Sequence, residues 1–98
     1  MILVRVHTRG PEVLVAACDE RLFGTTLREG EVRLHVSSFY EGERMTEEEF
    51  VARLRGATIG NFVGRETVAA AQRAGFVGED GILWIGGEPH AQMVVVAG

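Results

Sequence analysis

Residues 2–17 read ILVRVHTRGPEVLVAA, and this stretch decides the fold class. Apolar and polar side chains alternate along residues 2–7, which is the period-two pattern of a strand with one buried face. Residues 8–11 (TRGP) are a turn signal, because glycine adopts backbone angles closed to other residues and proline cannot donate a ladder hydrogen bond. Residues 12–17 form a second apolar run. The sequence therefore predicts an antiparallel hairpin over residues 2–17.

A helix is predicted to begin after Thr46, where the sequence TEEEF forms a capping box. We expect the Thr46 hydroxyl to accept the backbone N–H of Glu49, and the Glu49 carboxylate to accept the backbone N–H of Thr46. Met45 and Phe50 stand at the two positions of a hydrophobic staple. Gly56 is expected to end this helix.

A second helix is predicted over residues 57–74, a stretch rich in alanine. Gly56, Gly60 and Gly64 recur every four residues and would share one side of a continuous helix. Three interpretations stay open. The outer glycines end helices, the glycines permit close packing, or the ridge that they form admits a ligand or partner, with Asn61 at its border. Asn61 itself is either a helix cap or a ligand contact.

The remaining elements are short. Asp19 is expected to cap a helical turn over residues 21–26, and residues 31–36 alternate as a strand. Residues 82–85 and 91–97 are predicted to pair around a glycine-rich loop. The resulting order is β-β-β-α-α-β-β. We expect an α+β fold with a mostly antiparallel sheet and two helices on one face.

The composition fits one globular domain over residues 1–98. The chain is 46% hydrophobic and 24% charged, which excludes intrinsic disorder. All ten basic residues are arginine, so Schiff-base chemistry and a phosphate-loop lysine are excluded. The net charge of −4 opposes nonspecific binding to a phosphate backbone, because such binding needs a basic surface.

The sequence also predicts where the protein works. No apolar run reaches the roughly 20 residues needed to cross a bilayer, and no leader-like segment precedes the first strand. The lone Cys18 cannot form an intrachain disulfide. We therefore expect a cytoplasmic protein without membrane contact.

The most concentrated polar feature is GGEPHAQ, residues 86–92. Gly86 and Gly87 can direct successive backbone amides into one anion-binding nest. His90 is a candidate acid, base or ligand near neutral pH, with Gln92 on the same strand face to hold it. The alternative interpretation is a tight turn followed by an exposed histidine.

Neither a metal nor a cofactor is predicted. The candidate ligands lack the spacing of known metal sites, and the histidines fall on different strands. These candidates are His7, His35, His90, Cys18, Asp19 and Glu20.

An RNA-binding surface is a further hypothesis. Arginines on or near the first three strands could hold phosphates while neighbouring aromatic rings stack on bases. The residues concerned are Arg5, Arg9, Arg28, Arg33, Arg44, Phe39 and Tyr40. Alternatively, the arginines pair with carboxylates on neighbouring strands. The carboxylates concerned are Glu12, Glu31, Glu41 and Glu43.

Several stretches together carry a family resemblance: MILVRVH, VLVAACDE, FYEGE, ATIGNFVG and IGGEPHAQ. They resemble the archaeal domain of unknown function family 424, from Met1 to about Val96. The resemblance implies an archaeal cytoplasmic protein. It supplies no activity, only a loose suggestion of RNA or translation-linked binding. Gly60 departs from the family pattern, which favours a small residue such as alanine there.

These observations lead to one site hypothesis and three functions. We expect the polar residues of the family motifs to converge on one surface near the end of the sheet. The hypothesis names Asp19, Glu20, Asn61, Gly86, Gly87, His90 and Gln92. The favoured function is a binding module for RNA or a translation-associated partner. The alternatives are a structural subunit, such as a homodimer through an edge strand, and an enzyme. In the enzyme, His90 would be the general acid or base, with Asp19 or Glu20 as its partner or as a metal ligand.

Overall fold

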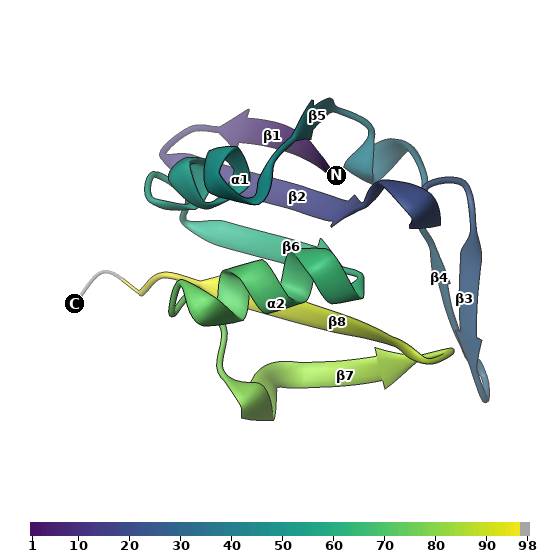
Figure 1. Cartoon of the computed structure of the whole chain (residues 1–98). Coiled ribbons are helices and arrows are strands. Elements are labelled where there is room, and N and C mark those ends of the chain that lie inside the picture. Colours follow the sequence, from purple (N-terminus) through teal and green to yellow (C-terminus); the bar gives the residue numbers. More distant parts are fainter. Residues whose placement is uncertain (97–98) are drawn as a thin grey trace.

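The computed structural model describes residues 1–96, which form an α+β fold (Figure 1). The main sheet has the strand order β5-β1-β2-β6-β8-β7. Its strands are β1 (Ile2–Arg9), β2 (Glu12–Asp19), β5 (Glu43–Met45), β6 (Ile59–Val63), β7 (Ile82–Ile85) and β8 (Glu88–Val94). A separate hairpin pairs β3 (Thr26–Glu29) with β4 (Val32–His35). The helices are α1 (Glu47–Leu54) and α2 (Arg65–Arg73), with single 3-10 turns η1 (Glu20–Leu22), η2 (Ser38–Tyr40) and η3 (Glu79–Gly81).

The β1–β2 hairpin confirms the first prediction. Its register runs from Arg9 opposite Glu12 to Ile2 opposite Asp19. All neighbouring strands of the main sheet pair antiparallel except β2 and β6, which are parallel. The expected α+β class with a mostly antiparallel sheet is confirmed.

Each face of the main sheet has its own core. Both helices cover one face, here called the helix face, where Val15, Phe62 and Met93 are buried beneath them (Figure 1). The β3–β4 hairpin runs across the strands at one end of the sheet (Figure 1). Together with η2 it covers part of the opposite face, here called the hairpin face, where Cys18 and Tyr40 are buried. Successive side chains of a strand alternate between these two faces.

Helix α1 begins as predicted. The Thr46 hydroxyl accepts the Glu49 backbone N–H at 3.2 Å, and the Thr46 N–H donates to the Glu49 carboxylate at 3.0 Å. Met45 and Phe50 are buried in the same core on the helix face. The capping box and the staple residues thus fix where α1 starts.

The helix predicted over residues 57–74 is wrong in its first half. Residues 59–63 form β6, which lies between β2 and β8 in the middle of the sheet. Pairing on both sides and burial of Phe62 outweigh the local helical signal. The glycine ridge therefore does not exist. Gly60 does permit close packing, but in a strand, where a Cβ would overlap the ring of Phe62.

Smaller corrections concern the short elements. The turn expected over residues 21–26 is η1, and no side-chain hydrogen bond from Asp19 caps it. Strands β3 and β5 were not predicted, because each has four residues or fewer and no strong alternation. Val32, an apolar residue of the alternating stretch 31–36, is exposed, whereas Val36 is buried. Strand β8 begins at Glu88 rather than residue 91, and Ala97 of that prediction lies outside the described residues.

Within residues 1–96, no helix is long and apolar enough to traverse a bilayer.

Candidate functional site

The structure divides the predicted site residues into two groups. Asn61, His90 and Gln92 lie on the hairpin face of adjacent strands, where Asn61 pairs with Gln92 across β6 and β8. The other group stands at the end of the sheet that holds the β7–β8 turn and comprises Asp19, Glu20, Gly86 and Gly87.

Asn61 is the centre of a small polar cluster. Its side-chain oxygen accepts the Tyr40 hydroxyl at 2.6 Å and faces His90 Nε2 at 3.1 Å. Because this oxygen only accepts, the proton of neutral His90 sits on Nε2. The ring Nδ1 is then an acceptor. We call these residues the Tyr40–Asn61–His90 cluster.

Burial shapes the chemistry of this cluster. His90 is half-buried, and burial lowers its pKa, so the imidazole is neutral at pH 7. Its side-chain partner is an amide rather than the carboxylate proposed for the enzyme alternative. Burial, followed by the nearby Cys18, raises the pKa of Tyr40 to about 12. The cluster therefore offers neutral hydrogen-bonding groups.

Tyr40 lies in the interior, whereas the RNA-binding hypothesis places it on the surface. It was expected on an RNA-facing surface, but its ring is buried and only its hydroxyl serves the cluster. Tyr40 belongs to η2, and 21 positions separate it from Asn61. No local pattern indicates a contact at that separation.

Asp19 stabilises the start of α2. Its buried carboxylate accepts the backbone N–H groups of Glu66 at 3.1 Å and Thr67 at 2.8 Å, and the Thr67 hydroxyl at 2.7 Å. It thereby caps α2 from the end of β2. Gly64 leaves room for this carboxylate, since a Cβ there would overlap it.

Arg21 connects Asp19 to the β7–β8 turn. Its guanidinium donates to both carboxylate oxygens of Glu88, at 2.8 and 3.0 Å, and to Asp19 at 3.1 Å. These hydrogen bonds hold the pKa of Glu88 below its ordinary value. Glu20 instead pairs with Arg44 at 2.6 Å on the surface. Asp19 and Glu20 are thus each bound to an arginine, and neither contacts His90.

The two glycines form a tight turn between β7 and β8. Gly86 and Gly87 both have positive φ, 58° and 81°, as a two-residue type I′ turn requires. The Gly86 N–H donates to Glu29 at 3.1 Å, and the Gly87 carbonyl accepts from Arg65 at 3.3 Å. The Glu29 carboxylate of the chain itself therefore binds one of the two amides that an anion nest would use.

A basic surface lies on the β3–β4 hairpin. Arg28 stands directly opposite Arg33, and Thr26 stands opposite His35 with 2.7 Å between their side chains. These four residues, here called the basic hairpin surface, point away from Leu27 and the core. Within residues 1–96, neither arginine forms an ion pair with a carboxylate.

The expected carboxylate partners of the arginines do not neutralise them. Four glutamates were the candidate partners. Among the described residues, none of them forms an ion pair with an arginine within 4.0 Å: Glu12, Glu31, Glu41 and Glu43. Arg5 donates to the backbone carbonyl of Ser38 at 2.9 Å. Near it, Phe39 is 40% exposed and stacks on His7 with ring centroids 4.9 Å apart.

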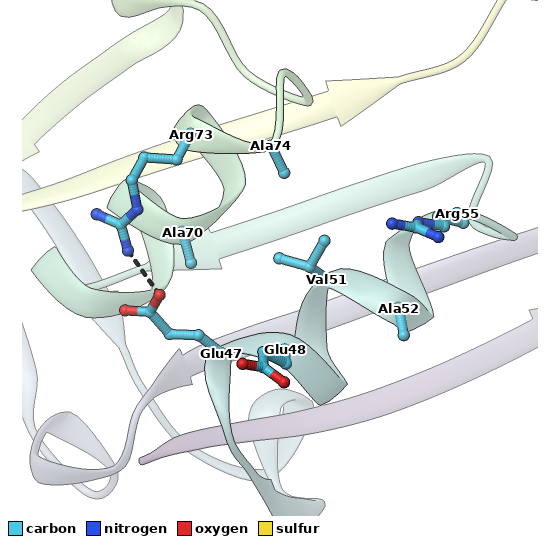
Figure 2. Close-up of a pocket in the computed structure, with 8 residues that line it drawn as sticks. All are labelled: Glu47, Glu48, Val51, Ala52, Arg55, Ala70, Arg73 and Ala74. Carbon is cyan, nitrogen blue, oxygen red and sulfur yellow. Dashed lines mark hydrogen bonds and ion pairs between the residues drawn. The ribbon is translucent and has the colours of Figure 1, made fainter.

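An open groove of about 390 Å³ lies between α1 and α2, and Figure 2 draws the residues that line it. Val51 and Ala70 contribute apolar side chains, and the Glu47–Arg73 ion pair at 2.6 Å spans the two helices. The groove shares no residue with the predicted site. The described part of the chain contains no cluster of three or more histidine, cysteine or acidic side chains that could hold a metal.

The model of the family described as "Protein of unknown function (DUF424)" matches residues 7–96. The chain belongs to this DUF424 family. The resemblance found in the sequence motifs is therefore confirmed. A solved structure also matches this chain and is described as "Crystal structure of an uncharacterized conserved protein from Methanopyrus kandleri". It is 32% identical with a TM-score of 0.82, over 94% of this chain and 89% of that chain.

No curated protein matches this DUF424 chain. The family description states no activity, and neither does the description of the solved relative.

Proposed function

We propose that the chain is a binding module for single-stranded RNA and that the basic hairpin surface holds the phosphates. The Arg28–Arg33 cross-strand pair carries this proposal. Like charges directly opposite one another destabilise a strand pair. The chain contains twelve glutamates, yet among residues 1–96 none forms an ion pair within 4.0 Å of either guanidinium group. A phosphate between the two guanidinium groups removes the repulsion and gains charge-assisted hydrogen bonds.

The hairpin face supplies groups that suit bases. The stacked rings of Phe39 and His7 offer a flat surface of the kind on which bases stack. Asn61, His90 and Gln92 present amide and imidazole groups on the same face, and such groups bind the edges of unpaired bases. In this proposal Asp19, Glu20, Gly86 and Gly87 support the fold rather than contact the RNA. A translation-associated partner and a cytoplasmic location stay predictions from the sequence.

The test measures fluorescence anisotropy of a labelled RNA of about 12 unpaired nucleotides. We expect affinity to fall as salt rises from about 50 mM to about 200 mM. The Arg28→Gln/Arg33→Gln variant should bind at least about tenfold more weakly, with a salt slope lower by about 1. The matched control is Arg53→Gln/Arg55→Gln, which removes the same charge from the region of α1 and should bind like the wild type.

Two results would overturn the proposal. One is the lack of binding by the wild-type protein at about 50 mM salt, where electrostatic contacts are strong. The other is an equal loss of affinity in both double variants, since that would report net charge alone. Circular dichroism of each variant establishes that the fold is intact.

A further inference from the structure

Trp84 is a large aromatic side chain that the fold leaves open to solvent. It is 60% exposed on the edge strand β7, and within residues 1–96 no other aromatic ring packs against it. Its ring borders a shallow hollow on the helix face, which is lined also by Val68, Ile82 and Pro89. An exposed indole beside an apolar hollow suits a flat ligand that stacks on it.

Two polar side chains, Arg65 and Gln72, line the same hollow. The Arg65 guanidinium donates to the Gly87 carbonyl at 3.3 Å, and within residues 1–96 it forms no ion pair. A guanidinium group binds phosphate oxygens, and an amide binds the edge of an unpaired base. The hollow therefore combines a ring, a cation and an amide, which are the groups that bind a nucleotide.

This hollow and the basic hairpin surface lie on either side of the β7–β8 turn. Gly86 in that turn is two residues beyond Trp84, which is about 7 Å along a strand. A Cβ on Gly86 would lie 3.0 Å from the backbone carbonyl oxygen of Arg28. In Figure 1 the tip of the β3–β4 hairpin reaches the same turn. Phosphates on the hairpin are thus close enough for a base of the same strand to reach Trp84.

We propose that Trp84 is a base-stacking residue for the RNA strand whose phosphates bind the basic hairpin surface. The inference rests on the proposed RNA binding and adds a path for the strand, from the hairpin past the β7–β8 turn. One base stacks on the indole ring, Gln72 binds the edge of that base, and Arg65 holds a phosphate beside it. Because every base has a flat face, Trp84 contributes affinity rather than sequence preference.

The carboxylates near this path already have partners in the protein. Glu29 accepts the Gly86 N–H at 3.1 Å, and Glu88 accepts two hydrogen bonds from Arg21, at 2.8 and 3.0 Å. The acidic turn η3 lies at the other end of β7. The strand is therefore expected to follow the turn end of β7, away from η3.

Trp84 is the single tryptophan, so its emission tests the inference directly. We expect the RNA of about 12 unpaired nucleotides to quench this emission with the same dissociation constant as the anisotropy titration gives. The Arg28→Gln/Arg33→Gln variant should shift both titrations to higher RNA concentration by the same factor. Unchanged emission at RNA concentrations that saturate the anisotropy would overturn the role of Trp84 and leave the proposed function standing. No binding in either titration would overturn both.

Two substitutions of the same side chain separate stacking from simple apolar contact. Trp84→Leu keeps an apolar side chain without a ring and should bind RNA at least about fivefold more weakly. The salt slope should stay unchanged, because stacking releases no counterions. Trp84→Phe is the matched control, since it keeps a ring and should bind within about twofold of the wild type. Equal affinities of the two variants would contradict stacking, and circular dichroism of each establishes that the fold is intact.

The role of Arg65 has its own signature. Arg65→Gln should lower the salt slope by about 1, because one phosphate contact is lost. The quenching of Trp84 at saturating RNA should persist in this variant. An unchanged salt slope would remove Arg65 from the path.

Discussion

Asp19 accepts both the backbone N–H and the hydroxyl of Thr67, at 2.8 and 2.7 Å, although 48 positions separate the two residues. Both side chains are buried. Most helix caps come from the residue just before the helix, but Gly64 stands at that position of α2 and has no side chain to offer. The end of one strand thus supplies the cap for a distant helix.

The first prediction concerns this cap. Asp19→Ala leaves buried N–H groups and the Thr67 hydroxyl without their acceptor, so the free energy of unfolding should fall by about 2–4 kcal/mol. Urea denaturation measures the change. The control is Glu20→Ala, which breaks only the exposed pair with Arg44 and should cost less than about 1 kcal/mol. Equal losses in the two variants would refute a special role for Asp19.

The second prediction distinguishes strand from helix at Gly60. Gly60→Ala forces a Cβ against the buried Phe62 ring, and we expect a loss of about 1–3 kcal/mol in the free energy of unfolding. Gly56→Ala is the matched control, because a Cβ there meets no atom within 4 Å. It should leave stability unchanged or raise it by up to about 1 kcal/mol. Stabilisation by Gly60→Ala would instead fit a helical residue 60.

The third prediction is a loss of stability in alkali. Burial raises the pKa of Cys18 from 9.0 to about 12 and that of Tyr40 from 10.0 to about 12. The unfolded chain therefore releases these protons first, so the free energy of unfolding should decline as the pH rises from about 9 to about 12. Urea titrations across this range measure the decline. Tyr40→Phe and Cys18→Ala should each make it shallower, and an unchanged slope in both would contradict the assignment.

The fourth prediction concerns His90 in mild acid. Burial lowers its pKa in the folded state, whereas the unfolded chain binds the proton near the ordinary value of 6.5. Stability should therefore fall as the pH drops below about 6.5. A proton NMR titration of the imidazole should place the His90 midpoint below this value. His90→Gln should show a smaller loss between pH 7 and about 5 than the wild type, and a midpoint above 6.5 would exclude the burial effect.

Local signals account for the elements that the sequence predicted. The β1–β2 hairpin and the start of α1 follow from alternation and from a capping box. The end of α2 is equally local: the Phe76 N–H donates to Ala71 at 2.9 Å and the Gly75 N–H to Gln72 at 3.0 Å. This is the Schellman arrangement expected of a terminal glycine. Each of these motifs is complete within a few residues of chain.

Non-local pairing accounts for the errors. Residues 59–63 combine glycine with apolar residues beside an alanine-rich stretch, and such a run does not separate a buried strand from a helix. Residues 59–63 form a strand because they pair with β2 on one side and with β8 on the other. The predicted site residues also depend on non-local contacts. Asn61 and His90 lie on facing strands and bond to each other, whereas Asp19 turns toward α2. The buried Tyr40 had no sequence signal for its contact with Asn61.

The remote cap has a consequence for synthesis. The first hairpin can form as soon as residue 19 has left the ribosome, but its terminal carboxylate then has no amide to bind. Only when residues 66 and 67 emerge does Asp19 gain its partners. A nascent chain that stops before α2 thus keeps a solvated charge at the end of its first hairpin, which opposes premature closure of the interior.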